Sequence, residues 1–275
     1  MIISAFADEI ASDLGVQVAV LTRHGIDHVD LRAVGDGNVI ELDDAQAIAL
    51  RDQLRRHGLS VATIASPIGK EPSDIEPAVL RRRMLRAARV AHLLGTDLVR
   101  VFGFYAPDGG GDWHEASLRS LRLLASCARQ AEVTLLLENE VGTAADSIEH
   151  ATELLASLAD EHVGAAFDPA NALRCGDQPY PDGYARVRPW LRQVHVKDLD
   201  EDGRVVPAGF GEADWAGLLG ALRRDGYRGL ISLEPHLLRA GRQGGFTGPT
   251  RFGEAHRALR ALMTSNGTRS TRAPA

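Results

Sequence analysis

Eight short apolar segments, rich in β-branched residues, recur along almost the whole chain. Each is four to six residues long, and near-continuous apolarity over that length is typical of a strand buried on both faces of a parallel sheet. The segments are 2–6, 28–31, 60–65, 97–102, 133–137, 163–167, 193–196 and 230–233. This series constrains the fold more than any other feature, because eight such strands require a sheet that is covered on both faces.

Segments with helical periodicity separate the predicted strands. The predicted helices are 43–57, 76–94, 117–131, 147–158, 215–224 and 253–263, and the first two end beside Gly58 and Gly95, as helices often do. The segment 180–190 contains two prolines, so any helix there is expected to be short. Alternating strands and helices predict parallel strands joined by right-handed crossovers.

Eight such units in 275 residues favour a closed (β/α)8 barrel, the TIM-barrel architecture, over an open doubly wound sheet. The open sheet would need a glycine-rich phosphate loop after the first strand, and Ala5-Phe6-Ala7-Asp8 is not one. We expect a single barrel domain over residues 1–263. The polar, aperiodic segment 264–275 is predicted to be a disordered tail.

Composition excludes several classes of partner. The formal charge of −6, the isoelectric point near 5.9 and an aromatic content of 5% argue against nucleic acids and anionic membranes. No apolar run approaches the roughly 20 residues that span a bilayer, and the N-terminus does not resemble a signal peptide. Cys127 and Cys175 lack metal or redox spacing and are expected to be free thiols. These features predict a cytoplasmic protein.

Acidic and histidine side chains stand at the ends of the last four predicted strands. Glu138 follows the three leucines of LLLENE, Asp168 follows VGAAF, His195 lies in QVHVKD and Glu234 follows LISL. The carboxyl ends of barrel strands share one face, so these side chains are expected to meet there. Three carboxylates in one place repel each other unless a cation neutralises them. The pattern therefore predicts a divalent metal ion, with Mn²⁺ preferred and Mg²⁺, Co²⁺ or Zn²⁺ as alternatives.

The motifs LLLENE, FDPAN, VHVKDLDEDGRVVPAGFGEADW and SLEPH resemble those of the xylose isomerase-like TIM barrels. That family includes sugar epimerases, inosose dehydratase, hydroxypyruvate isomerase and endonuclease IV. The resemblance covers nearly the whole chain and is greatest to the ketose 3-epimerase and inositol-catabolism branch. It implies that Glu138, Asp168, His195 and Glu234 are the metal ligands. Where the epimerases often place a substrate-contacting histidine, this chain has Asn171.

These residues predict an isomerase or epimerase that acts on a ketose or related polyol through an enediolate. A bound metal would act as a Lewis acid. Glu138 and Glu234 would serve as the paired acid and base, one removing the carbon-bound proton and the other returning it on the opposite face. Asp168 and His195 would act only as ligands.

Three further residues are predicted to bind substrate: Asn171, Lys197 and His236. Lys197 shares strand parity with His195 and so reaches either a substrate oxygen or phosphate, or a neighbouring acid as a salt bridge. Substrate identity is expected to depend on the first four strand–helix loops, whose candidate residues are Phe6, Asp8, Arg32, Lys70, Arg100 and Trp113.

Other functions compete with the isomerase or epimerase hypothesis. The same residues suit a metal-dependent lyase or dehydratase on a keto-inositol or a 3-keto sugar. Endonuclease IV-like phosphodiester cleavage would need more histidines at strand ends, and a non-catalytic sugar-binding barrel would tolerate loss of the ligands. The expected partner is a small carbohydrate, and a homodimer is a candidate assembly because related barrels often pair.

Overall fold

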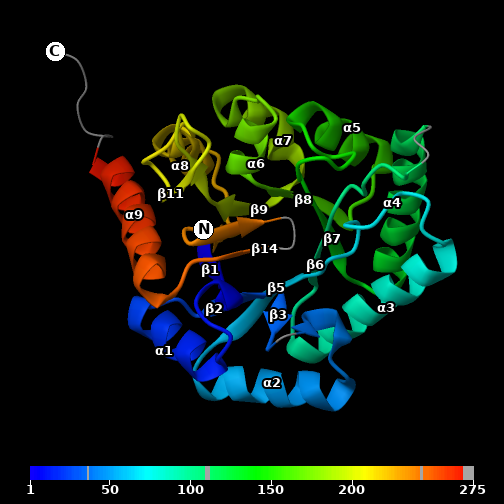
Figure 1. The fold of residues 1–275 in the computed structure, drawn as a ribbon, viewed down its shortest axis with the longest axis horizontal. Coiled ribbons are helices and arrows are strands. Elements are labelled where there is room, and N and C mark those ends of the chain that lie inside the picture. The colour runs from blue at the N-terminus through cyan, green and yellow to red at the C-terminus, as the bar shows by residue number, and fades with distance from the viewer. Residues whose placement is uncertain (36, 109–111, 242–243, 269–275) are drawn as a thin grey trace.

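Eight parallel strands close into a barrel in the computed structural model, which describes residues 1–35, 37–108, 112–241 and 244–268 (Figure 1). The order around the barrel is β1-β12-β9-β8-β7-β6-β5-β2, so β1 pairs with both β2 and β12. This confirms the predicted TIM barrel. Its strands are β1 (Ile2–Phe6), β2 (His28–Leu31), β5 (Ser60–Ala65), β6 (Leu98–Val101), β7 (Thr134–Glu138), β8 (Val163–Phe167), β9 (Leu191–Val196) and β12 (Leu230–Leu233).

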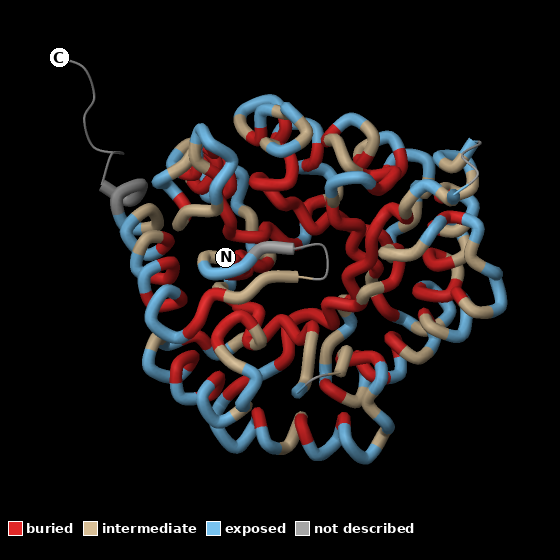
Figure 2. The backbone as a smooth tube through the Cα atoms, in the orientation of Figure 1, coloured by how far each residue is buried: buried red, intermediate tan, exposed pale blue. Residues whose placement is uncertain are grey.

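Helices surround the barrel and bury their apolar faces against it (Figures 1 and 2). All six predicted helices are present; 215–224 has the predicted bounds, and the other five have shifted ends. The helices are α1 (Leu14–His24), α2 (Asp44–Arg56), α3 (Pro77–Leu94), α4 (Trp113–Gln130), α5 (Ile148–Leu158), α6 (Pro169–Arg174), α7 (Tyr184–Val187), α8 (Trp215–Arg224) and α9 (Pro249–Thr268). The segment expected to hold only a short helix contains the four-residue α7 between the one-turn elements η3 (Pro179–Gly183) and η4 (Arg188–Trp190). Within the described residues, no helix is long and apolar enough to cross a membrane.

Helix α1 is absent from the predicted set of helices. Its apolar positions include Val16, Val18 and Val20, and β-branched residues have lower helix propensity. The helix nevertheless has clear end signals. The side chain of Asp13 accepts a hydrogen bond from the Val16 amide at 2.8 Å, and Gly25 ends the helix with a φ of 65°. Burial of its inner face against the barrel outweighs the weak propensity.

The predicted boundary of a disordered tail at Thr264 is wrong, because α9 continues to Thr268. The Thr264 hydroxyl donates to the backbone carbonyls of Arg260 and Ala261, which lets a polar residue continue the helical turn. The remainder of the predicted tail, residues 269–275, lies outside the described residues.

Three two-stranded hairpins follow barrel strands: β3 (Ala33–Val34) with β4 (Gly37–Asn38), β10 (Asp198–Leu199) with β11 (Val205–Val206), and β13 (Arg239–Gly241) with β14 (Gly244–Phe246). The β13–β14 hairpin is drawn across the middle of the barrel in Figure 1. The chain that leaves this hairpin is bound to the turn after β1, because the amides of Thr247 and Gly248 both donate to the carbonyl of Glu9, each at 2.9 Å. The sequence patterns did not predict the β13–β14 hairpin.

A buried polar layer crosses the barrel interior. Ser4 donates to Asp30 at 2.6 Å, and Gln193 donates to Asp30 at 3.1 Å and to Ser232 at 2.7 Å. Burial raises the pKa of Asp30, with hydrogen bonds from Ser4 opposing the shift. The layer ties together β1, β2, β9 and β12, the strands that close the barrel.

Candidate metal centre

The four residues predicted as metal ligands converge on one point. Glu138 is the last residue of β7, Asp168 follows β8, His195 lies in β9 and Glu234 follows β12. Each is at most 3% exposed. One ligand atom from each lies within 4.8 Å of every other, so the four are placed to hold one ion. The strand-end pattern therefore located the cluster correctly.

His195 forms the centre of this cluster. Its Nδ1 lies 3.1 Å from Glu138 Oε1 and 3.2 Å from Glu234 Oε2. Although burial opposes it, the two carboxylates raise the pKa of His195. The ring meets Phe6 edge-on, with centroids 5.2 Å apart, which fixes the plane of the imidazole.

Asp168 is held by its backbone and by one of its two oxygens. Asn139 exchanges two hydrogen bonds with the Asp168 backbone, of 2.8 and 2.9 Å. Oδ1 of Asp168 caps α6 by accepting from the amides of Ala170 and Asn171. Oδ2 is thereby left to face the cluster. Asn139 was missed in the sequence, although it directly follows Glu138 at the same strand end.

The donor set fits a divalent cation. Asp168 Oδ2 and Glu234 Oε2 are buried and point toward positive groups, with Lys197 Nζ 2.6 Å from the first and His195 Nδ1 3.2 Å from the second, so both oxygens lie where a cation is favoured. Three carboxylates and one imidazole suit hard and borderline metals such as Mg²⁺ and Mn²⁺. The residues present are thus able to hold the metal that the sequence predicted.

Two arginines hold the outer oxygens of the two glutamates. Arg32 donates to Glu234 Oε1 at 2.9 Å and also binds Asp8 and Glu9, at 2.8 and 3.2 Å. Arg100 donates to Glu138 Oε2 at 2.6 Å. Burial raises the pKa of Glu138, but His195 and Arg100 outweigh it and lower that pKa.

Glu234 is ionised for a similar reason. Burial works against the charge, but Lys197 and His236 hold the pKa of Glu234 well below its usual range. Lys197 Nζ lies 2.6 Å from Asp168 Oδ2 and 3.6 Å from Glu234 Oε2, so the salt bridge predicted as one alternative is formed. Lys197 also lines the cavity, so the second predicted role, contact with a substrate oxygen or phosphate, is compatible with its position.

His236 and Asn171 also lie at the cavity. Nε2 of His236 is 3.0 Å from Glu9 Oε1 and 3.4 Å from Glu234 Oε1. Asn171 Nδ2 donates to the carbonyl of Asn139 at 3.0 Å and to Glu140 Oε2 at 3.2 Å. The structure thus brings together all seven residues predicted to act as ligands, acid or base, or substrate contacts.

Glu9 organises the side of the site beneath the β13–β14 hairpin. It is fully buried, accepts from Arg32 and from the Thr247 hydroxyl at 2.5 Å, and lies beside His236. Gly245 packs so closely here that an added Cβ would lie 2.0 Å from the His236 ring. The sequence patterns gave no role to Glu9, although it lies in the FADEI motif.

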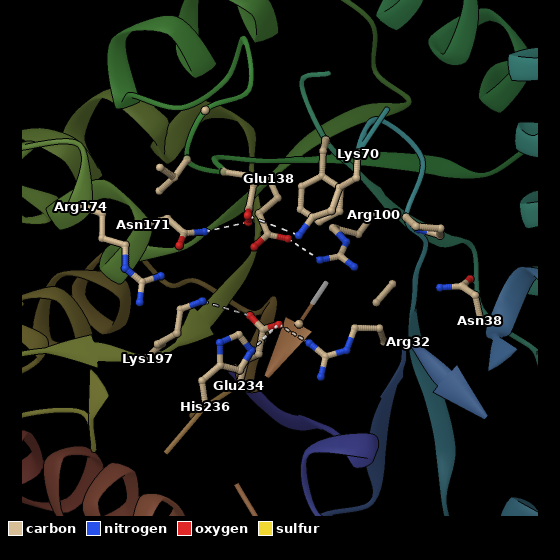
Figure 3. Close-up of a pocket in the computed structure, with 17 residues that line it drawn as sticks. Arg32, Asn38, Lys70, Arg100, Glu138, Asn171, Arg174, Lys197, Glu234 and His236 are labelled. Carbon is tan, nitrogen blue, oxygen red and sulfur yellow. Dashed lines mark hydrogen bonds and ion pairs between the residues drawn. The ribbon is translucent and has the colours of Figure 1, made fainter. Parts of the chain in front are cut away.

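A cavity of about 350 Å³ opens above the cluster (Figure 3). Of the six residues on which substrate identity was expected to depend, Arg32, Lys70 and Arg100 line it. Asp8 binds Arg32, and Phe6 packs beneath that guanidinium at 5.2 Å. Trp113 instead begins α4 and packs against the core, and it is not among the described residues that line the cavity. A helix cap decides this, because the Asp112 side chain accepts from Glu115 N and starts the helix there.

Comparison with known proteins agrees with this architecture. The model of the xylose isomerase-like TIM barrel family matches residues 18–262, and the chain belongs to that family. No curated protein matches the sequence.

Solved structures share the fold at low sequence identity. A D-tagatose 3-epimerase-like protein has a TM-score of 0.77 at 16% identity, covering 97% of this chain and 98% of its own. The probable 3-DHS dehydratase AsbF of Bacillus anthracis has a TM-score of 0.72 at 17% identity, covering 98% and 100%. A xylose isomerase-like TIM barrel protein of Mycobacterium smegmatis in complex with magnesium has a TM-score of 0.70 at 19% identity, covering 96% and 97%.

Proposed function

We propose that this protein is a metal-dependent isomerase or epimerase that enolises a ketose or related polyol. The observation that carries the proposal is the buried cluster of Glu138, Asp168, His195 and Glu234 at the cavity floor. A divalent ion held there would polarise a carbonyl and offset the negative charge of an enediolate. Magnesium in one structural neighbour and epimerase-like chemistry in another support this reading.

The chain's own residues would divide the work. Glu138 and Glu234 are ionised carboxylates at the cavity and are therefore the candidate bases for a carbon-bound proton. Arg32 and Arg100 hold their outer oxygens and so fix the direction from which each can approach a substrate. Lys197 presents an ammonium to the same space, where it can stabilise an oxygen that gains negative charge.

A dehydratase is the second candidate, and one observation favours it. Two-base epimerisation needs one carboxylate ionised and the other protonated, but the pKa of both glutamates is lowered by neighbouring cations. A β-elimination needs one ionised carboxylate to remove the carbon-bound proton, and the Lys197 ammonium at the same cavity could protonate the departing hydroxyl group. The probable dehydratase among the structural neighbours has the same fold. The endonuclease-like alternative has less support, because each described metal-type cluster contains a single histidine.

Deuterium exchange tests the proposal and separates its two forms. The protein is stripped with a chelator, reloaded with Mn²⁺, Mg²⁺ or Co²⁺, and incubated in D₂O with ketoses, ketose phosphates, inososes and 3-keto glycosides. Metal-dependent deuterium incorporation with an isomeric product supports the isomerase or epimerase, whereas a new enone absorbance supports the dehydratase. Failure of the loaded protein to exchange a proton in any of these compounds would refute the enolisation mechanism.

A matched pair of variants links the exchange to the site. Glu138→Gln should lose it, whereas Glu153→Gln, on the exposed face of α5, should retain it. Equal exchange by both variants would remove Glu138 from the proposed mechanism.

A further inference from the structure

Two cations are stacked on one aromatic ring beside the metal-type cluster. The Nζ of Lys70 lies 4.4 Å from the centroid of the Phe102 ring, and the Cζ of Arg100 lies 4.2 Å from the same centroid. All three residues line the cavity, and the close-up shows Lys70 and Arg100 on the same side of it (Figure 3). Phe102 therefore fixes two like charges close together at the cavity wall.

Arg100 has capacity for a further partner. It is only 4% exposed, and its Nε is buried without a hydrogen-bond partner although NH1 binds Glu138. Lys70 Nζ contacts Glu140 at 3.3 Å. Burial lowers the pKa of Lys70, Glu140 opposes that shift and Arg100 adds to it. An anion that contacts both side chains would satisfy Nε of Arg100 and offset the repulsion between the two cations.

We propose that Lys70 and Arg100 form an oxyanion subsite, so that the substrate is an anionic ketose carrying a carboxylate or a phosphate. This inference rests on the proposed function. In that function the carbonyl end of the substrate would lie at the metal-type cluster, and the inference places the anionic end of the same substrate at Lys70 and Arg100. Arg100 joins the two places, since it also donates to Glu138. The ring of Phe102 contacts both cations and holds them in place.

Calorimetric titration of the Mg²⁺-loaded protein tests the subsite with three probes that differ only at carbon six. D-Fructose carries a hydroxymethyl group there, D-fructuronate a carboxylate and D-fructose 6-phosphate a phosphate. We expect at least one anion to bind about tenfold more tightly than fructose, in line with one added charge-assisted contact. Whichever anion is preferred identifies the group. Absence of an anion preference, including absence of binding by all three probes at millimolar concentration, would overturn the proposal.

Two charge-removing variants locate the subsite. Lys70→Met should reduce the anion preference, the ratio of anion affinity to fructose affinity, about tenfold. Arg174→Met removes another cavity-lining cation, but Arg174 is exposed to solvent and should affect the preference less than about threefold. A larger loss in Arg174→Met than in Lys70→Met would contradict the assignment to Lys70 and Arg100.

The result is distinguishable from failure of the proposed function. Anion preference without deuterium exchange would retain the subsite and reject enolisation. Deuterium exchange at equal rates on neutral and anionic ketoses, with equal affinities, would retain enolisation and reject the subsite.

Discussion

The two halves of the barrel supply opposite charges to one cavity. The C-terminal half, β7, β8, β9 and β12, provides the three carboxylates and the imidazole of the candidate metal centre. The N-terminal half provides cations: Arg32 follows β2, Lys70 lies in the loop after β5, and Arg100 is in β6. Each half also pairs some charges internally, since Lys197 binds Asp168 and Arg32 binds Asp8, and the closed barrel adds the contacts between the two halves.

The pairing across the halves has a chemical consequence. Arg100 binds Glu138 and Arg32 binds Glu234, so each glutamate proposed as a base depends on a cation from the other half. The arginines help to keep the carboxylates ionised inside a buried site. The C-terminal half therefore holds the reactive groups and most of the cations that keep them ionised, and the arginines of the N-terminal half fix the direction of their outer oxygens.

The largest effect is expected when a glutamate loses its charge. Glu234→Gln should lower the rate of deuterium exchange by about 10² to 10⁴-fold, because the amide keeps the shape but cannot accept a carbon-bound proton. The rate is measured by NMR in D₂O with the metal-loaded protein, and circular dichroism verifies the fold. A variant with near-normal exchange would show that Glu234 is not the base.

Removing Arg32 or Arg100 tests how far the carboxylates of the C-terminal half depend on cations of the N-terminal half for stability. Arg32→Met should lower the free energy of unfolding by about 3–5 kcal/mol, because it leaves Asp8, Glu9 and Glu234 without their shared partner. Arg100→Met should cost less, since Glu138 keeps His195 as a neighbour. Urea denaturation of both variants with chelator present measures the difference. Equal losses would mean that the two pairings are equivalent.

The hairpin cover offers a third test. Gly245→Ala places a methyl group against His236 and should displace the β13–β14 hairpin, lowering kcat/KM by about tenfold with a stability loss of about 1–3 kcal/mol. Gly220→Ala is the matched control, because its Cβ would meet only the flexible end of Arg224 in α8. Unchanged kinetics in Gly245→Ala would show that the hairpin does not shape the site.

The smallest effect is expected on the pH dependence of stability, at the contact between α1 and α9, where the two halves join away from the site. His24 of α1 and His256 of α9 have ring centroids 4.8 Å apart. Burial, with a contribution from His24, lowers the pKa of His256 to about 4. The unfolded chain therefore binds a proton near pH 6.5 that the folded chain does not, and the free energy of unfolding should fall as the pH drops from about 6.5 to 4.

His256→Gln should flatten that part of the stability profile. Urea denaturation at several pH values measures it, and the slope that remains belongs to other groups. An unchanged slope would show that His256 does not contribute to acid sensitivity.

The predictability of the site differs between the halves. Glu138, Asp168, His195 and Glu234 could be predicted because each lies within one residue of the end of an apolar strand, and strand ends share one face. Arg32, Lys70 and Arg100 were recognised only as residues of the substrate loops, because the path of a loop depends on contacts that have no short sequence signature. Helix α1 was missed since its valines resemble a strand.

The barrel, its eight strands and the four residues at the candidate metal centre could all be predicted from sequence patterns. Strand periodicity and strand ends are local properties, and the parallel topology turns them into a shared location. Which charges meet could be seen only in the folded protein. The bonds from Arg32 to Glu234, from Arg100 to Glu138 and from Glu9 to the β13–β14 hairpin join residues 38 to 238 positions apart. Such pairings depend on barrel closure and loop packing, which no local pattern encodes.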